Sequence, residues 1–279
     1  MRIFLIIPIL FIFLASCSNS NDFDIPQISK LEKLEEHSNQ FIKGIYSYDN
    51  GIHVAIGFGI ANSIMVEGDG GNIIIDTTDD VSQAKEVLSE FQKINQNPIK
   101  AIIYTHNHGD HVFGASEFYN SQEEKPLVIA HSTTAEKVEK ILGIINPIIT
   151  LRSGKMFGTN LDDDELINVG LGPYLSAGRT SPGYIAPTMT FEKELKLELA
   201  GHKVELYHAP GETDDQLFVW FPELSALMPG DNFYTTFPNL YTIRGTSHRD
   251  VIGWVNSIDK MRSLDPQYLF PSHTMPIVG

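Results

Sequence analysis

The sequence has little cysteine, few basic residues and, beyond its first residues, no long apolar run. Cys17 is the only cysteine among 279 residues, so no internal disulfide can stabilise the fold. No stretch after residue 17 is long and apolar enough to cross a bilayer. The 20 Lys and Arg stand against 35 Asp and Glu, which gives a net charge of −15. That charge repels phosphate and argues against nucleic acid as a partner, and an anionic substrate would need a local basic group.

The N-terminus has the pattern of an export signal. Met1-Arg2 is a short positive start, and residues 3–14 are a continuous apolar run that is too short to span a bilayer comfortably. Leu14-Ala15-Ser16-Cys17 resembles the lipobox of bacterial lipoproteins, in which the cysteine becomes acylated. We therefore expect residues 1–17 to be a lipoprotein signal peptide, and Cys17 to anchor the protein to the bacterial cell envelope, at the outer membrane or the periplasmic face. A plain secretory signal or a small membrane anchor is the alternative.

The remaining pattern predicts a tether with a short helix over residues 18–40 and one domain over residues 41–279. Short β-rich runs with tight turns over 45–75 predict an antiparallel meander, followed by a helix over 79–94 and a buried strand over 101–104. Strands and a helix recur over 190–270, so two β-then-α halves predict an α/β protein, a four-layer αββα sandwich. Residues 146–187 are rich in glycine and proline and predict a loop-rich excursion, either a lid or binding wall or a solvated insertion.

Four potential metal ligands follow the strand at 101–104. His106, His108, Asp110 and His111 lie within six residues. Imidazole nitrogens and carboxylate oxygens bind zinc at ~2.0–2.2 Å, and a tight turn that contains glycine can bring several of them together. One turn supplies only part of a two-metal site. The other candidates also follow apolar runs, although each could be a simple turn residue: Glu212, Asp231 and His273.

On these residues the chain resembles the metallo-β-lactamase fold superfamily, whose HxHxDH motif is matched in full. Within it, the chain is most similar to the alkyl sulfatases. These carry a glutamate, here Glu212, where most of the superfamily has a histidine ligand, and their sulfate-binding segment resembles residues 239–245. The chain differs from that branch at Asp231, where the alkyl sulfatases carry a glutamate. The resemblance implies two Zn²⁺ ions, or other divalent metals. One would be held by His106, His108 and Glu212, the other by Asp110, His111 and His273, with Asp231 between them.

The same resemblance implies a zinc-dependent hydrolase that cleaves alkyl sulfate esters to alcohol and sulfate with a metal-bound hydroxide. Asp110 would belong to the catalytic centre, Arg244 would hold the sulfate, and His248 would protonate the leaving alcohol. Asn239, Tyr241 and Tyr174 are further candidate substrate contacts.

The expected partner is a small anionic or amphiphilic substrate. Membrane contact is expected only through the lipid anchor, and a homodimer only if the full-length chain carries that branch's dimerisation domain. The alternatives are a hydrolase of lactones, carboxylic esters or phosphodiesters, or a metal-bound lipoprotein that binds a ligand without turnover.

Overall fold

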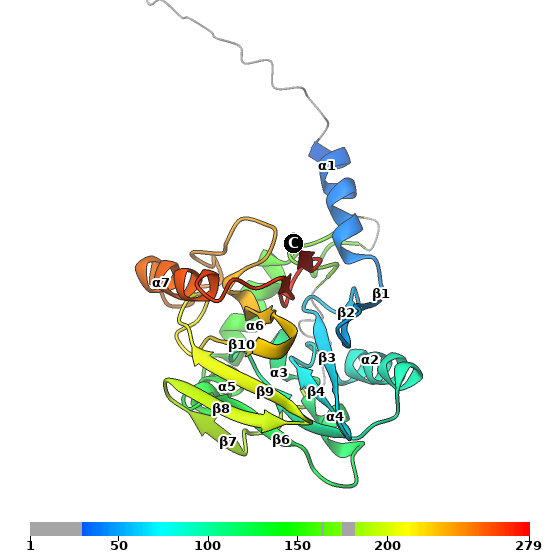
Figure 1. Ribbon diagram of the computed structural model, residues 1–279. Helices are drawn as coiled ribbons and strands as arrows, with labels where there is room; N and C mark the ends of the chain where they lie inside the picture. The colour runs from blue at the N-terminus through cyan, green and yellow to red at the C-terminus, as the bar shows by residue number, and fades with distance from the viewer. Residues whose placement is uncertain (1–29, 163–164, 175–181) are drawn as a thin grey trace, which may run out of the picture.

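The computed structural model describes residues 30–162, 165–174 and 182–279. The predicted signal peptide with Cys17, and the tether as far as residue 29, lie outside the described residues. The described chain begins with helix α1 (Lys30–His37) and the short helix η1 (Ser38–Phe41), and α1 stands away from the rest of the molecule (Figure 1). Within these ranges, the helices are all too short or too polar to cross a bilayer.

The first sheet has seven strands that lie in the order of the sequence. Its strands are β1 (Gly44–Ser47), β2 (Ile52–Ile56), β3 (Ser63–Gly68), β4 (Gly71–Ile75), β5 (Ile99–Ile103), β6 (Leu127–His131) and β7 (Met189–Phe191). β1 to β4 are antiparallel, which confirms the predicted meander, whereas β4 to β7 are parallel. β4 is buried along its whole length, as the near-continuous apolar sequence of a strand covered on both faces requires.

The second sheet has six strands in the order β13-β12-β11-β10-β9-β8. Its strands are β8 (Glu194–Leu199), β9 (His202–His208), β10 (Leu217–Phe221), β11 (Ala226–Met228), β12 (Tyr268–Leu269) and β13 (Ile277–Val278). Neighbouring strands are antiparallel except β11 and β12. β8 lies at the edge of the sheet and alternates polar residues with leucines, because only one of its faces contacts the core.

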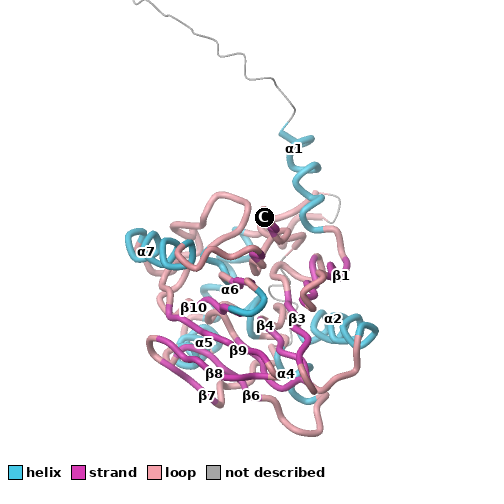
Figure 2. The backbone as a smooth tube through the Cα atoms, in the orientation of Figure 1, coloured by secondary structure: helices cyan, strands magenta, loops and turns pink. Residues whose placement is uncertain are grey.

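The two sheets pack face to face and helices cover their outer faces. Side chains of both sheets share one buried cluster between them, which includes Ile75, Ile103, Leu206 and Val219. Helices α2 (Val81–Ile94), α4 (Ala115–Asn120) and α5 (Thr134–Leu142) pack on the first sheet, and α7 (Val251–Arg262) packs on the second. α2 and α7 lie on opposite sides of the strands in Figures 1 and 2. The predicted four-layer αββα sandwich is confirmed.

Residues 189–199, where the sequence predicts that strands resume, form two strands in different sheets. β7 pairs with β6 in the first sheet, and β8 pairs with β9 in the second. The chain turns between them at Glu192 and Lys193. The turn contains no glycine, proline or asparagine, so the sequence carries no strong turn signal at the change of sheet.

The prediction of loops over residues 146–187 was wrong at its start. Residues Asn146–Met156 form helix α6, with Pro147 in its first turn. A proline there fits the helix, because the first turn needs no backbone N–H donor. The helix has no distinct apolar stripe, so the helical period is hidden in the sequence. Residues 163–164 and 175–181 of the excursion lie outside the described residues.

Candidate metal centre

All seven predicted ligands come together where strands of both sheets end. β5 leads through Tyr104 and Thr105 to His106, and the single turn of α3 (Gly109–Val112) carries Asp110 and His111. The second half contributes three side chains from three separate loops. Glu212 follows β9, Asp231 lies in the short helix η3 (Gly230–Asn232) after β11, and His273 follows β12. The packing of the two sheets against each other therefore brings the predicted ligands together.

The ligand atoms form two compact groups. His106, His108 and Asp231 make one group and Asp110, His111 and His273 make the other, with the ligand atoms of each group within 4.8 Å of one another. Asp231 lies between the groups. Its Oδ2 is 3.6 Å from His106 Nε2, 3.5 Å from His111 Nε2 and 3.1 Å from His273 Nε2. One carboxylate is thus placed to serve both groups.

Outer contacts turn three of the imidazoles so that Nε2 faces the centre. Asp76 Oδ2 is 2.7 Å from His111 Nδ1, and the carbonyl oxygen of Ile60 is 2.9 Å from His273 Nδ1. The hydroxyl of Thr105 is 3.0 Å from His106 Nδ1. Partners of this kind fix the ring orientation and the tautomer of metal-binding histidines. His108 differs, because its Nδ1 faces inward, 2.9 Å from His106 Nε2.

Burial and the charges around the centre lower the pKa of some of the imidazoles and raise the pKa of others. Burial and the neighbouring His111 lower the pKa of His106 to about 4, and burial with the adjacent His106 ring lowers the pKa of His108 well below its usual range. Both rings are neutral at pH 7, with a lone pair for a metal ion. Burial also disfavours the charged form of His273, but Asp231 outweighs it and raises the pKa of His273 to about 9. A metal ion would compete with that proton.

The sequence predicts Glu212 as the third ligand beside His106 and His108, but the position of Glu212 in the structure differs from that prediction. Asp231, not Glu212, completes that compact group. Glu212 Oε1 is 4.0 Å from His108 Nδ1 and 2.7 Å from Arg249 Nη2. Burial, followed by the charge of Asp231, raises the pKa of Glu212 to about 8, and Arg249 opposes that rise. The glutamate is therefore at the centre, but in this structure its carboxylate is shared with an arginine.

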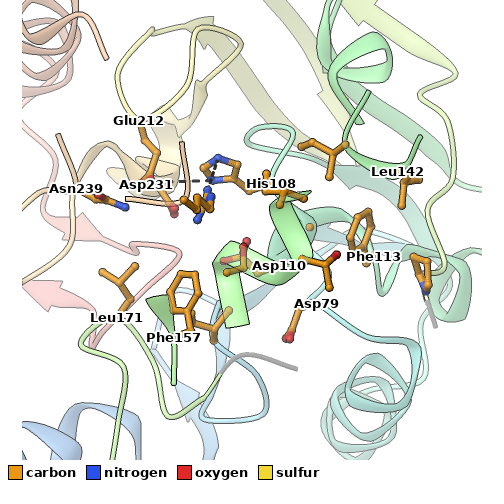
Figure 3. A pocket seen from close by; sticks show the side chains of 18 of the residues that line it. Asp79, His108, Asp110, Phe113, Leu142, Phe157, Leu171, Glu212, Asp231 and Asn239 are labelled. Carbon is orange, nitrogen blue, oxygen red and sulfur yellow. Dashed lines mark hydrogen bonds and ion pairs between the residues drawn. The ribbon is translucent and has the colours of Figure 1, made fainter. Parts of the chain in front are cut away.

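A cavity of about 330 Å³ opens over the centre and joins a polar end to an apolar wall. Figure 3 shows Phe113 and Leu142 on one side of Asp110, and Phe157 and Leu171 on another. Residues that line the polar end are His108, Asp110, Glu212, Asp231, Asn239, Arg244 and His273. The apolar wall is formed by Ile60, Phe113, Ile141, Leu142, Ile149, Phe157, Leu171 and Pro182.

Two of the predicted substrate contacts line this cavity. Asn239 and Arg244 both lie at its polar end, and Arg244 Nη2 is 3.2 Å from His108 Nε2. Arginine can only donate, so His108 Nε2 is the acceptor in this contact. Burial lowers the pKa of Arg244 from its ordinary value, but the ordinary value is so high that the guanidinium stays charged. A cation is therefore held beside the predicted metal ligands.

The other three candidates are not brought into the cavity. His248 is exposed and lines an adjoining groove. Tyr241 is 60% exposed, and the Tyr174 hydroxyl donates to the carbonyl oxygen of Phe58 at 3.2 Å. Both tyrosines are absent from the cavity lining. The geometry gives no support to His248 as an acid or to the tyrosines as substrate contacts.

The match to a family model settles the relationship that the fold and the ligand order suggest. The model of the metallo-beta-lactamase superfamily matches residues 56–273. The chain belongs to the metallo-beta-lactamase superfamily. The match runs from the end of β2 to the last predicted ligand, so all seven predicted ligands of this superfamily member fall inside it.

Within the superfamily, the chain is similar to several alkyl sulfatases, both in sequence and in structure. The chain is 38% identical, over 221 residues, to a linear primary-alkylsulfatase from a Pseudomonas strain, covering 77% of this chain and 42% of that relative. It is 26% identical to the alkyl/aryl-sulfatase BDS1 of Saccharomyces cerevisiae, over 85% of this chain and 38% of that relative. The stereoselective inverting sec-alkylsulfatase Pisa1 from a Pseudomonas species matches with a TM-score of 0.81 and 24% identity, over 89% of this chain and 40% of that chain, which shows a shared fold. The chain spans about two fifths of each of these proteins.

The superfamily fold implies a bound divalent metal, and the donors of this superfamily member fit one. Three buried atoms of the predicted ligand side chains have no hydrogen-bond partner: His111 Nε2, Glu212 Oε2 and Asp231 Oδ1. Buried polar atoms are rarely left unpaired in proteins, so such a group points to a missing ligand. Imidazole nitrogens mixed with carboxylate oxygens are donors that zinc and similar divalent ions accept.

Two buried aspartates that the sequence analysis missed hold the centre from outside. Asp76, directly after β4, contacts His111 Nδ1 at 2.7 Å and accepts from the Ser272 hydroxyl at 2.7 Å. Asp215 accepts from Asn107 Nδ2 and from the Thr134 hydroxyl. Asp76 follows the apolar run of β4 just as the predicted ligands follow theirs, so the same signal could have identified it.

Substitution of Asp76 by Asn should weaken metal binding without unfolding the protein. Asn keeps the shape of the side chain and tolerates the left-handed backbone at φ 57°, but it has no charge and exchanges one of the two acceptor oxygens of Asp76 for an NH2 donor, which weakens the contact that orients His111. We expect divalent-metal affinity, measured by competition with a chromophoric chelator, to fall by about 10- to 100-fold. Asp265→Asn is the matched control, since Asp265 is exposed and has φ 50°. Equal affinities of the Asp76 variant and the parent would contradict this role.

Proposed function

We propose that this protein is an alkyl sulfatase that hydrolyses sulfate monoesters of amphiphilic alcohols. The observation that carries the proposal is the cavity with Arg244 and Asn239 beside the metal ligands at one end and an apolar wall at the other. The 38% identity to a linear primary-alkylsulfatase supports the choice of ester. A substrate with an anionic head and an apolar tail matches both ends of such a cavity.

Charge supports an anionic head group at Arg244. The chain carries a net charge of −15, so binding of an anion needs a cation at the site. Arg244 lies beside His108, and a guanidinium can form two parallel hydrogen bonds to a sulfate group. Its neighbour Arg249 is already paired with Glu212. Arg244 is therefore the arginine at this end whose side chain can turn to a substrate.

The apolar wall supports an alkyl tail. Ile141 and Leu142 come from α5, Ile149 from α6, and Phe113 follows α3. Binding cavities of a few hundred cubic ångströms that combine many apolar side chains with a few placed polar groups are typical of small-molecule sites. Burial of each methylene group contributes about 0.8 kcal/mol, so the wall favours long over short alkyl esters.

We propose two zinc ions as the metals of the centre. His106, His108 and Glu212 would hold one ion, Asp110, His111 and His273 the other, and Asp231 would contact both. When bound, such a pair supplies Lewis acidity and lowers the pKa of water to about 7, which provides a nucleophile near neutral pH. The chain's own residues orient the ester: Arg244 holds the sulfate oxygens, and the apolar wall excludes water from the alkyl side.

Sulfate release from dodecyl sulfate by the zinc-loaded protein tests this function. Arg244→Ala removes charge-assisted hydrogen bonds worth about 1.5–3 kcal/mol, so kcat/KM should fall by about 10- to 150-fold. KM should account for much of the fall, since the sulfate is anionic before and during the reaction. Zinc content should not change. Arg262→Ala, at a side chain that is 78% exposed, is the control and should match the parent.

Two results would contradict the proposal. One is a zinc-loaded parent that releases no sulfate but hydrolyses lactones, carboxylic esters or phosphodiesters. The other is an Arg244→Ala variant with the kcat/KM of the parent.

We also propose that the mature protein is anchored to the bacterial cell envelope through acylated Cys17. The support is the sequence alone: an apolar run of residues 3–14 followed by Leu14-Ala15-Ser16-Cys17. In a bacterial host, the parent should sediment with the membrane fraction and incorporate labelled fatty acid. Cys17→Ala should lose the label. Equal labelling of the two proteins would overturn the proposed anchor.

A further inference from the structure

A buried ion pair lies behind the metal centre. The side chains of Arg249 and Glu212 are only 4% and 3% exposed, and Arg249 Nη2 is 2.7 Å from Glu212 Oε1. The N–H is not aligned for a hydrogen bond, so the contact is an electrostatic one. Removing one partner of a buried pair leaves an uncompensated charge and is strongly destabilising. The presence of Arg249 is therefore tied to the presence of Glu212.

The two oxygens of Glu212 differ in their contacts. Oε1 lies 2.7 Å from Arg249 Nη2 and 4.0 Å from His108 Nδ1, whereas Oε2 is buried and has no hydrogen-bond partner. The backbone around Glu212 is also held, because its N–H donates to Asn232 Oδ1 at 3.3 Å, and Asn232 Nδ2 donates to the carbonyl oxygen of Ala209 at 2.7 Å. Glu212 is therefore held in place by Arg249 and by its backbone contacts, and no hydrogen bond competes for its Oε2.

The same guanidinium reaches the segment that carries the candidate anion contacts. Arg249 Nη1 donates to the carbonyl oxygen of Asn239, whose side chain lines the cavity. Helix α7 helps to fix the position of Arg249, because the next residue, Asp250, caps that helix. The Asp250 side chain accepts from Ile252 N at 3.1 Å. Arg249 thus joins the loop after β9 to the loop that carries Asn239 and Arg244.

We propose that Arg249 is a positioning residue and that Glu212 and Arg249 together replace one neutral histidine ligand. When Glu212 is ionised, as a carboxylate that binds a metal ion is, the pair has no net charge, just as a neutral imidazole has none, so it presents one oxygen donor without changing the charge of the centre. Arg249 also sets the position of Asn239 relative to that donor. This inference rests on the proposed metal centre and on no particular substrate.

A double-substitution cycle tests whether Glu212 and Arg249 act together as one neutral pair. Glu212→His should lower zinc affinity, measured by chelator competition, at least tenfold, because it leaves the Arg249 cation buried and unpaired beside the metals. Arg249→Met should also lower it, since Glu212 loses the partner that keeps it charged and oriented. Glu212→His combined with Arg249→Met should restore affinity to within a few-fold of the parent. Arg262→Met is the control for loss of an exposed arginine and should change nothing.

The variant Arg249→Lys separates the effect of the positive charge of Arg249 from its effect on the positions of Glu212 and Asn239. Lysine keeps the cation but lacks the fork that reaches Glu212 and Asn239 together. We expect zinc affinity near that of the parent, and a KM for dodecyl sulfate raised several-fold with little change in kcat.

The readouts distinguish failure of this inference from failure of the proposed function. A double variant that binds zinc no better than Glu212→His would overturn the inference, even if sulfate hydrolysis were observed. Restored affinity in the double variant would support the paired unit whether or not dodecyl sulfate is a substrate. Thermal unfolding of the chelated proteins identifies any variant that loses affinity by failing to fold, and the Arg249→Lys result then decides the inference: a zinc affinity at least tenfold below that of the parent would overturn it.

Discussion

The structure depends on holding several carboxylates and imidazoles together in a place with almost no water. His106, His111, Glu212, Asp231 and His273 are each at most 4% exposed. Buried charges of one sign raise the free energy of the folded state unless cations or hydrogen bonds compensate them. The protein compensates them in three ways: protons or a divalent metal at the centre, outer acceptors such as Asp76, and the buried guanidinium of Arg249. The last two explain why the centre cannot be understood from its metal ligands alone.

This constraint links the fold to the chemistry. The first half of the chain supplies one compact turn, at the end of β5, whereas the second supplies single residues after three strands. Neither half holds a complete group of donors, so the apolar cluster between the sheets, which brings the halves together, also completes the centre. Helices α5 and α6 then add the apolar wall. Under the proposed function, a loop that carries a cation and an apolar cavity wall direct this metallo-beta-lactamase-superfamily framework to a sulfate ester.

Much of this could be predicted from sequence because the signals are local. The run from His106 to His111 packs four donors into one turn, and the other ligands each follow an apolar strand, so all seven candidates were found at the centre. The parts that escaped prediction depend on contacts between distant segments. The pairing of Glu212 with Arg249 spans 37 positions, and helix α6 lacks a visible apolar period. The exposure of Tyr241 also follows from the path of a loop, which residue types do not specify.

The central claim is that these seven side chains form one centre for two divalent ions. The most direct test is the metal stoichiometry of the folded chain, measured by elemental mass spectrometry after equilibrium dialysis against zinc, together with the shift of the thermal unfolding temperature. The account predicts two zinc ions per chain and an unfolding temperature that rises with zinc concentration, because a ligand that binds the folded state stabilises it. Retention of one ion or none, with no change in unfolding temperature, would contradict it.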